Sequence, residues 1–283
     1  MRVIIDGVAH DAASAVISVF DWAFIRGFGV FEVVRVYQRA LFRLDPHLDR
    51  LEKSAAAMAI PAPDRTALGV DMARVAAANG DGQVRVILTG GGRDPLQEAA
   101  PRIVVMWEPL PFVPARVKVL PMVAPWHPAT TESGFPGVKW TSYAPNMATT
   151  DRARRLGYDD AMLLTKDGVV LEGPTFSFAW VHRGRIETPS LDLGILPSIT
   201  RDVVLECCAR LRLPVAEGHY PIERVEAAEE VLALSTVKEV VPVELIGDHV
   251  VSGGPVGSRL AAAFADVVAA ETMAANPSAA GIS

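Results

Sequence analysis

Alternating and continuous apolar runs in the first part of the chain predict β-strands joined by short turns. Residues 29–37 and 40–44 flank a Gln-Arg turn and predict a hairpin of β-branched and aromatic residues. Short apolar runs at residues 2–6, 84–89 and 102–107 predict three further strands.

Apolar residues spaced by three and four positions predict two helices in the same part, at residues 45–60 and 63–80. Asp45 is suited to cap the first of them, and Pro46 to occupy its first position. Leu48, Leu51 and Ala55 then fall on one face, so this helix is expected to pack on a sheet.

The second part of the chain repeats the mixture of strands and helices. Helices are predicted at residues 146–157, 198–211 and 254–272, and hairpins around Asp167-Gly168 and Arg183-Gly184. A strand, a turn and a strand are predicted at 230–247. This mixture predicts an α+β (mixed α/β) fold rather than a doubly wound sheet.

Prolines mark a boundary between the two parts. Pro109, Pro111 and Pro114 prevent both a helix and a central strand, so residues 109–116 are the expected linker. The sequence thus predicts a small α/β domain at 1–108 and a larger domain at 117–272. A small, polar tail at 273–283 is expected to be disordered.

Composition narrows the possible functions. The 283 residues carry a net charge of −6 and no long basic run, which argues against nucleic acid and anionic membranes as partners. No segment approaches the ~20 apolar residues of a membrane span, and the N-terminal residues lack the apolar core of a signal peptide. The adjacent pair Cys207 and Cys208 cannot form a disulfide framework, so a reducing cytoplasm is expected. Six scattered histidines predict no metal site.

Lys139, in the stretch "GVKWTSYAPN", is the first candidate for chemistry. A lysine among bulky apolar residues most often packs its stem and extends its amine to water. The alternative is a partly desolvated amine that is neutral often enough to act as a nucleophile. The lysine alone leaves both readings open.

Other segments supply groups that suit an anionic cofactor. Glu172 follows a strand, the stretch "LPSITRD" begins a helix with N–H groups and hydroxyls suited to phosphate, and Arg50 lies on a helix. Each has an ordinary structural alternative: a surface carboxylate, a helix cap or a solvated helix face.

In combination, seven segments resemble the class IV (fold-type IV) pyridoxal-phosphate aminotransferase family. They are "RGFGVFEVVRVY", "HLDRLEKSA", "VKWTSYAPN", "GYDDAMLL", "GVVLEGP", "LPSITR" and "STVKEVVPV". The resemblance implies a small N-terminal α/β domain, a larger C-terminal pseudo-barrel domain, pyridoxal 5'-phosphate as cofactor, and a homodimer.

The resemblance also implies roles for individual residues. Lys139 would bind the cofactor covalently and then shuttle the substrate proton, while Glu172 would pair with the pyridine nitrogen. Tyr143 falls near a position at the cofactor's phenolic oxygen. The phosphate would be held by Arg50 together with Ser198, Ile199, Thr200, Ser235 and Thr236.

Substrate recognition is the less determined part of the resemblance. The carboxylate-binding Arg and His of bacillary D-amino acid transaminases are not matched in the stretch "LTGGGRDPLQEAAPR", where Arg93 is the residue that lies near their positions. Arg26 precedes two glycines and is the preferred candidate, with Phe31 lining the pocket. The alternative for Arg26 is a surface ion pair with Asp21.

The segments "RGFGVFE" and "EGP" are most similar to plant-type D-amino acid transaminases and their actinobacterial relatives. The predicted activity is therefore amino-group transfer between D-amino acids and 2-oxo acids through pyridoxamine phosphate. An aminodeoxychorismate lyase, which releases pyruvate and 4-aminobenzoate, is the alternative. A branched-chain or R-amine transaminase follows it, and a non-catalytic protein on the same scaffold is disfavoured because Lys139 and Glu172 are both present.

Overall fold

The computed structural model describes residues 2–93, 98–130 and 134–275. They divide into two compact units. Unit 1 comprises the described parts of Met1–Pro111, Val138–Tyr143 and Val267–Ser283, and unit 2 comprises Phe112–Gly137 and Ala144–Asp266. The chain first passes from one unit to the other within the proline-containing segment 109–116. The expected tail at 273–283 begins inside a helix, and residues 276–283 lie outside the described residues.

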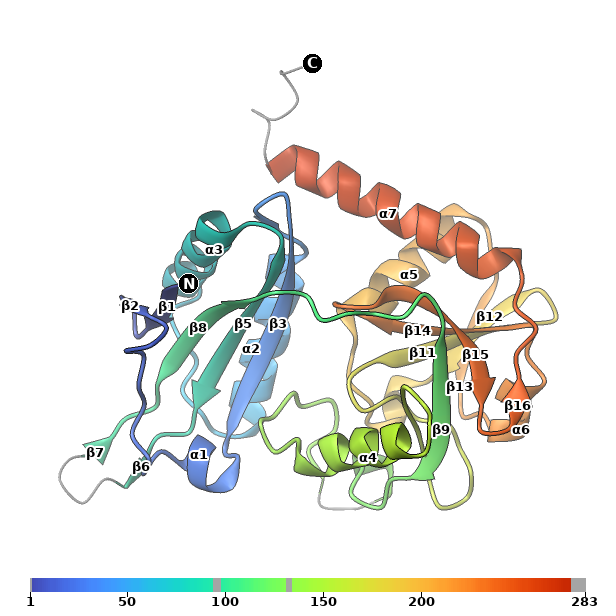
Figure 1. Ribbon diagram of the computed structural model, residues 1–283, viewed down its shortest axis with the longest axis horizontal. Helices are drawn as coiled ribbons and strands as arrows, with labels where there is room; N and C mark the ends of the chain where they lie inside the picture. Colours follow the sequence, from blue (N-terminus) through green and yellow to red (C-terminus); the bar gives the residue numbers. More distant parts are fainter. Residues whose placement is uncertain (1, 94–97, 131–133, 276–283) are drawn as a thin grey trace. The chain divides into compact units, whose positions relative to one another are not determined.

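An antiparallel sheet forms the centre of unit 1 (Figure 1). Its strands lie in the order β2-β1-β8-β5-β3-β4 among the described residues. Their bounds are β1 Arg2–Ile5, β2 Val8–Asp11, β3 Gly29–Tyr37, β4 Ala40–Leu41, β5 Gly82–Thr89 and β8 Ile103–Glu108. A separate small pair joins β6 (Gly92–Arg93) to β7 (Glu98–Ala99).

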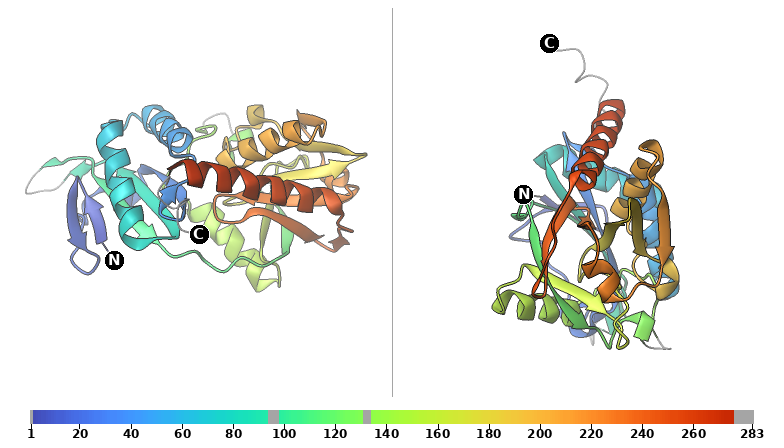
Figure 2. Two further views of the ribbon diagram at one scale, coloured as in Figure 1. Left: turned by 90° about the horizontal axis from the view of Figure 1, so that it is seen from above. Right: turned by 90° about the vertical axis from the view of Figure 1, so that its right-hand side faces the viewer.

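Two helices pack on one face of this sheet, α2 (Leu44–Ala57) and α3 (Arg65–Asn79) (Figure 2). The inward residues of β3 alternate, as the strand period requires, so that Val30, Val34 and Val36 meet Leu48 and Leu51 of α2. The hairpin and both helices predicted here are confirmed. The sequence did not predict the short helix α1 (Trp22–Arg26), which Asp21 caps by accepting from Ala23 N at 2.7 Å.

Unit 2 contains a mixed sheet in the order β10-β9-β15-β14-β11-β12-β13, with β16 beside β15. Its strands are β9 Val117–Val123, β10 Asp160–Leu164, β11 Ser177–His182, β12 Arg185–Pro189, β13 Val215–Gly218, β14 Glu230–Ser235, β15 Glu239–Ile246 and β16 His249–Val250. Strand β9 pairs in parallel with β10 and β15, and β12 pairs in parallel with β13. The predicted α+β mixture is therefore confirmed.

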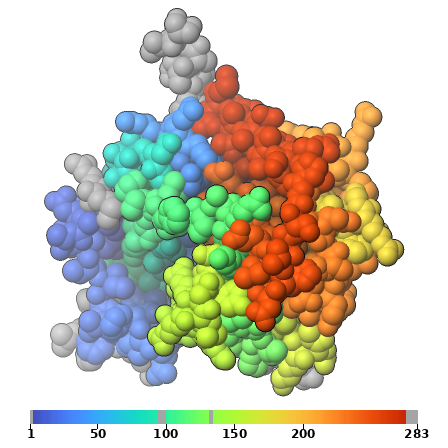
Figure 3. Space-filling model, turned by 45° about the vertical axis from the view of Figure 1, so that its right-hand side comes forward, coloured from blue at the N-terminus to red at the C-terminus, as the bar shows by residue number. Residues whose placement is uncertain are grey.

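Three helices lie close to the predicted positions: α4 Ala144–Arg155, α5 Ile199–Arg210 and α7 Pro255–Ala275, whose residues from Val267 onward belong to unit 1. The sequence did not predict the short helix α6 Ile222–Glu226. The 3-10 turns are η1 Pro128–Thr130 and η2 Leu191–Leu193. Space-filling Figure 3 shows α4 exposed on the surface. No helix among the described residues is both long enough and apolar enough to span a bilayer.

Both hairpins predicted in unit 2 are present. Arg183 and Gly184 both have positive φ, at 51° and 73°, and connect β11 to β12 as a tight antiparallel hairpin. Around Asp167-Gly168 the chain also turns back in the antiparallel direction: Thr165 N donates to Val169 O and Leu171 N donates to Leu163 O, each at 2.9 Å. Val170 forms a bridge with Leu164, and its N–H faces the other side and donates to Tyr220 O at 2.8 Å.

Candidate active site

Lys139 lies in an extended segment that belongs to unit 1, although the sequence analysis placed it in the second part of the chain. Phe31 N donates to Lys139 O at 2.9 Å, and Thr141 N donates to Gly29 O at 2.9 Å. Lys139 N donates to the Ser54 hydroxyl of α2 at 3.1 Å. Backbone pairing with the start of β3 therefore fixes the lysine on unit 1.

Aromatic rings surround the Lys139 amine. Nζ lies 4.6 Å from the ring centre of Phe31 and 5.7 Å from that of Tyr143. The two rings pack edge to face with their centres 5.2 Å apart. Three residues that the sequence analysis selected are thus brought together around one half-buried amine.

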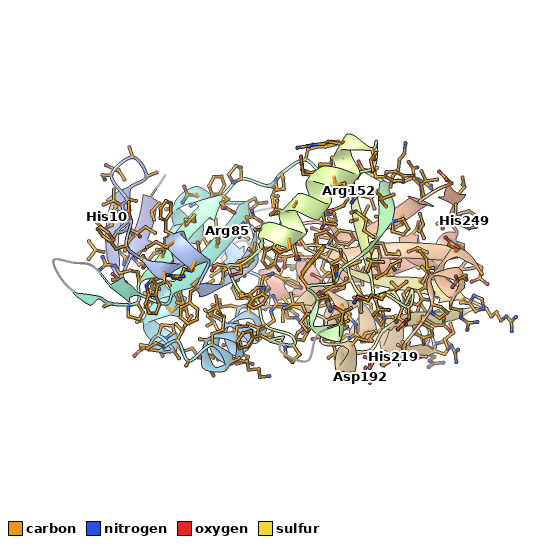
Figure 4. The ribbon with its side chains drawn as sticks, turned by 90° about the horizontal axis from the view of Figure 1, so that it is seen from below. His10, Arg85, Arg152, Asp192, His219 and His249 are labelled. Atoms are coloured by element: carbon orange, nitrogen blue, oxygen red, sulfur yellow. The ribbon has the colours of Figure 1, made fainter. Side chains whose placement is uncertain are left out.

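Arg85 of β5 lies beside the same aromatic group, with its guanidinium carbon 5.4 Å from the Phe31 ring centre (Figure 4). Its Nε and Nη2 donate to the two carboxylate oxygens of Glu108, each at 2.9 Å. Because Glu108 binds the Arg85 guanidinium through both oxygens, it already neutralises the positive charge of that group.

A buried carboxylate that the sequence analysis missed lies on the other face of β3. Glu32 accepts from Arg50 Nε at 2.7 Å and from Arg50 Nη2 at 2.9 Å, and His47 Nδ1 lies 2.8 Å away. The buried carboxylate of Glu32 thus fixes the orientation of the guanidinium of Arg50, the predicted phosphate ligand. The sequence pattern could have indicated this buried carboxylate, because Glu32 lies two residues from both Val30 and Val34 and therefore on the same inward face of the strand.

The ionisable side chains of this group shift one another's pKa values. Burial raises the pKa of Glu32, but the charge and hydrogen bonds of Arg50 and the hydrogen bond of His47 outweigh it and hold this pKa far below its usual range. Burial lowers the pKa of His47, and the contact with Glu32 offsets this only in part. His47 is therefore neutral while Glu32 and Arg50 form a buried ion pair.

Glu172, the predicted partner of the pyridine nitrogen, is positioned within unit 2. Its Oε1 lies 3.2 Å from His127 Nε2, and its Oε2 accepts from Leu196 N at 3.1 Å. Leu196 stands two residues before Ser198, so the carboxylate lies near the start of α5. The stretch "APWHPAT" carries no sequence signal that would have identified His127.

The start of α5 presents the predicted phosphate-binding groups. Ser198 caps the helix by accepting from Arg201 N at 3.3 Å. Ile199 and Thr200 occupy the first turn, where backbone N–H groups lack an acceptor within the helix and attract anions. The turn after β14 carries Ser235 and Thr236, and the Ser235 hydroxyl accepts from Lys238 N at 3.0 Å.

Arg26 is the last residue of α1 and is exposed. The next residue, Gly27, has a φ of 64° and accepts at its carbonyl from the hydroxyls of Thr141 at 2.6 Å and Ser142 at 2.8 Å. The end of α1 is thereby attached to the lysine segment. Asp21, the alternative partner of Arg26, instead accepts from Ala23 N and the Thr89 hydroxyl. Arg93 lies in β6, and its side chain is outside the described residues.

Comparison with known proteins decides the family. The model of the amino-transferase class IV family matches residues 29–246, which is most of the chain. The chain belongs to the class IV aminotransferase family. The expected family is thus confirmed. Within the described residues, no cluster of three or more His, Cys, Asp or Glu side chains could hold a metal ion.

Two similar members of the family carry the names of different activities. A protein of Methanocaldococcus jannaschii named provisionally as a branched-chain-amino-acid aminotransferase is 29% identical over 277 residues, covering 94% of this chain and 96% of its own. A bifunctional aminodeoxychorismate lyase / D-amino acid transaminase of Mycobacterium tuberculosis is 32% identical over 193 residues, covering 62% of this chain and 64% of its own.

A solved structure establishes the fold. The crystal structure of the branched-chain aminotransferase from Thermoproteus uzoniensis with norvaline has a TM-score of 0.88 and 26% identity, covering 98% of this chain and 97% of that chain. The chain therefore has the fold-type IV architecture that the resemblance implied. The names of these relatives do not agree on one substrate.

Proposed function

We propose that this chain is a pyridoxal-phosphate-dependent aminotransferase that moves the amino group between α-amino acids with apolar side chains and 2-oxo acids. Membership in the class IV family supports the aminotransferase activity and the cofactor. The observation that supports apolar substrates is the aromatic group of Phe31 and Tyr143 around the Lys139 amine. A substrate side chain held near this amine would contact the apolar surface of these rings.

The residues present fit the cofactor. An amine at Lys139, a carboxylate at Glu172, a buried guanidinium at Arg50 and a helix start at Ser198 are the groups that its aldehyde, ring nitrogen and phosphate require. When bound, pyridoxal phosphate supplies an electron sink for negative charge at the substrate Cα.

In this proposal, the remaining chemistry belongs to the side chains of the protein. Lys139 holds the cofactor covalently and, once released, its Nζ accepts the proton that leaves the substrate Cα. Glu172 keeps the ring nitrogen protonated. Arg50, Ile199, Thr200, Ser235 and Thr236 hold the phosphate. Arg26 binds the substrate carboxylate.

The neighbouring arginine supports the choice of apolar over acidic side chains. Arg85 lies next to Phe31 but is engaged at two nitrogens by Glu108. An acidic substrate side chain would have to displace this carboxylate, whereas an aliphatic side chain would pack on the ring. The relative from Thermoproteus uzoniensis, which holds norvaline, is consistent with this preference.

Half-reactions with single amino acids test the proposal. Alanine, norvaline, leucine and aspartate, each as both enantiomers, are mixed with the cofactor-loaded protein, and the loss of cofactor absorption is recorded. Three additional methylene-sized groups are worth about 2.4 kcal/mol at ~0.8 kcal/mol each. Leucine should therefore react about 50-fold faster than alanine in kcat/KM. A preference for aspartate, or no reaction with any amino acid, would overturn the proposal.

D-amino acid transamination is a second candidate within the same reaction class. The motifs "RGFGVFE" and "EGP" favour it, as does the Mycobacterium tuberculosis relative. The enantiomer panel decides between D and L substrates. Release of pyruvate from aminodeoxychorismate, without amino transfer from any amino acid, would instead indicate the lyase.

The homodimer and the reducing compartment implied earlier remain part of this proposal. Unit 1 exposes a run of large apolar side chains, namely Val16, Ile17, Val19, Phe20, Phe24 and Ile25. Apolar runs of this kind commonly mark protein interfaces, here with a second copy of the chain. Light scattering should give twice the mass of the chain, and Phe24→Lys should lower the measured mass towards that of a monomer.

The cysteines support the reducing compartment. Both are buried in α5 as free thiols.

A further inference from the structure

We propose that His127 is a positioning residue that donates a hydrogen bond to Glu172 and holds its carboxylate in a single orientation. This inference deepens the proposed function and rests on it, because it concerns the carboxylate assigned to the cofactor's ring nitrogen. All the groups that carry it belong to unit 2.

The hydrogen bonds of the imidazole determine its tautomer. Ala129 N donates to His127 Nδ1 at 3.1 Å, so Nδ1 is an acceptor and bears no hydrogen. The hydrogen of a neutral ring is then on Nε2, which lies 3.2 Å from Glu172 Oε1. His127 is 5% exposed, so water competes little for this contact. The ring therefore donates to the Glu172 carboxylate.

The second oxygen of Glu172 is fixed from another direction. Leu196 N donates to Oε2 at 3.1 Å. With one donor on each oxygen, rotation about the last side-chain bond breaks at least one hydrogen bond. Each oxygen of an ionised carboxylate has two acceptor sites. One site per oxygen consequently remains for a further N–H donor.

The imidazole itself is held by a tight turn after β9. His127 N donates to Ala124 O at 3.0 Å, and Thr130 N donates to His127 O at 2.8 Å. Beside it, Trp126 Nε1 donates to Asn146 Oδ1 at 3.1 Å, and Asn146 Nδ2 donates to the carbonyl of Pro174 at 2.8 Å. The turn is thus attached both to Glu172 and, through Asn146, to the loop that follows it.

Two amide substitutions separate the functional contact from the structural one. The amide oxygen of His127→Asn can take the place of Nδ1 and accept from Ala129, but the shorter side chain does not reach Glu172. The amide nitrogen of His127→Gln can take the place of Nε2 and donate to Glu172. His219→Asn is the matched control, because His219 is exposed and pairs with Asp192 (Figure 4).

The primary measurement is the dissociation constant of pyridoxal phosphate from the apo protein, followed by tryptophan fluorescence. A hydrogen bond to a charged group is worth about 1.5–3 kcal/mol, so His127→Asn should weaken binding about 10-fold or more. His127→Gln should remain within about threefold of the wild type. If His127 served only the turn, the order would reverse, because asparagine preserves the contact with Ala129. His219→Asn should not change the constant.

Nitrogen-15 NMR of histidine-labelled apo protein gives a second readout that needs no cofactor. His127 should appear as the neutral ring with its hydrogen on Nε2. A hydrogen on Nδ1, or a charged ring at neutral pH, would overturn the inference. If the wild type binds no pyridoxal phosphate, the proposed function fails. If the wild type binds it and His127→Asn binds equally well, only the role of His127 fails.

Discussion

Replacing Glu32 with glutamine should strongly destabilise unit 1. Glu32 is 0% exposed, and its carboxylate takes two hydrogen bonds from Arg50, at 2.7 and 2.9 Å. Glutamine preserves the volume and one acceptor but removes the negative charge. Arg50 is 7% exposed and would be left as a buried, uncompensated cation.

The expected loss of unfolding free energy follows from this burial. Breaking a buried ion pair by removing one partner costs about 3–5 kcal/mol. Because the pKa of Glu32 lies far below its usual value of 4.5 in the folded protein, its contribution is fully present above pH 4.5 and declines as pH falls below that value. The difference in unfolding free energy between wild type and Glu32→Gln should therefore be constant from about pH 5.5 to 8 and shrink in acid.

Urea unfolding measures this difference. With a slope of about 3 kcal/mol per M, the midpoint should fall by about 1–2 M. Glu52→Gln is the control, because Glu52 and Arg65 are partly exposed, with their nearest atoms 3.3 Å apart, and such pairs contribute below about 1 kcal/mol. Adding Arg50→Met to Glu32→Gln should restore part of the loss. Equal midpoints for the Glu32 and Glu52 variants, or strictly additive losses in the double variant, would refute this account of Glu32.

Three further predictions concern other residues. Borohydride reduction of the cofactor-loaded protein should fix the phosphopyridoxyl group to the peptide that contains Lys139; recovery on Lys118 would reject the assignment. Arg26→Ala should lower kcat/KM for amino acids by roughly 30-fold to several thousand-fold, from a loss of about 2–5 kcal/mol, and spare amines without a carboxylate such as (R)-1-phenylethylamine. An equal loss for both classes would exclude this role for Arg26. The hydrogen bond from Arg224 outweighs burial and lowers the pKa of Glu187 to about 2, so the stability that Glu187 contributes should be complete above pH 4.5 and be lost as pH falls towards 2. Urea unfolding of wild type and Glu187→Gln at pH 6 and pH 2.5 checks this, and an unchanged difference between them would contradict it.

Local patterns were sufficient to predict most elements of the fold. The β3–β4 hairpin, helix α2 and the turn at Arg183-Gly184 follow from strand alternation, helical spacing and turn residues over short stretches. Helix α1 was missed because it has only five residues, and its stability depends on the buried Asp21 cap and the contact of Asp21 with Thr89.

The arrangement of the candidate site was only partly predictable. Lys139, Arg50 and Glu172 could be selected because their motifs resemble those of a family, but their contacts depend on pairings between distant segments. Phe31 and Lys139 are 108 positions apart, and His127 and Glu172 are 45 apart. Nothing in the residues around His127 indicates that its ring meets a carboxylate, since the turn after β9 determines where the ring points.

The register of the lysine segment against β3 explains how one strand serves two chemical environments. Side chains alternate across a strand, so Phe31 lies on one face and Glu32 on the other. The hydrogen bond from Phe31 N to Lys139 O, together with that from Thr141 N to Gly29 O, fixes which of the two faces the lysine amine meets. A shift of one residue would exchange the faces. The amine would then lie beside the buried carboxylate of Glu32, where it would be held as a charged partner of an ion pair rather than beside aromatic rings. The register therefore places the candidate nucleophile on the face of β3 that carries Phe31.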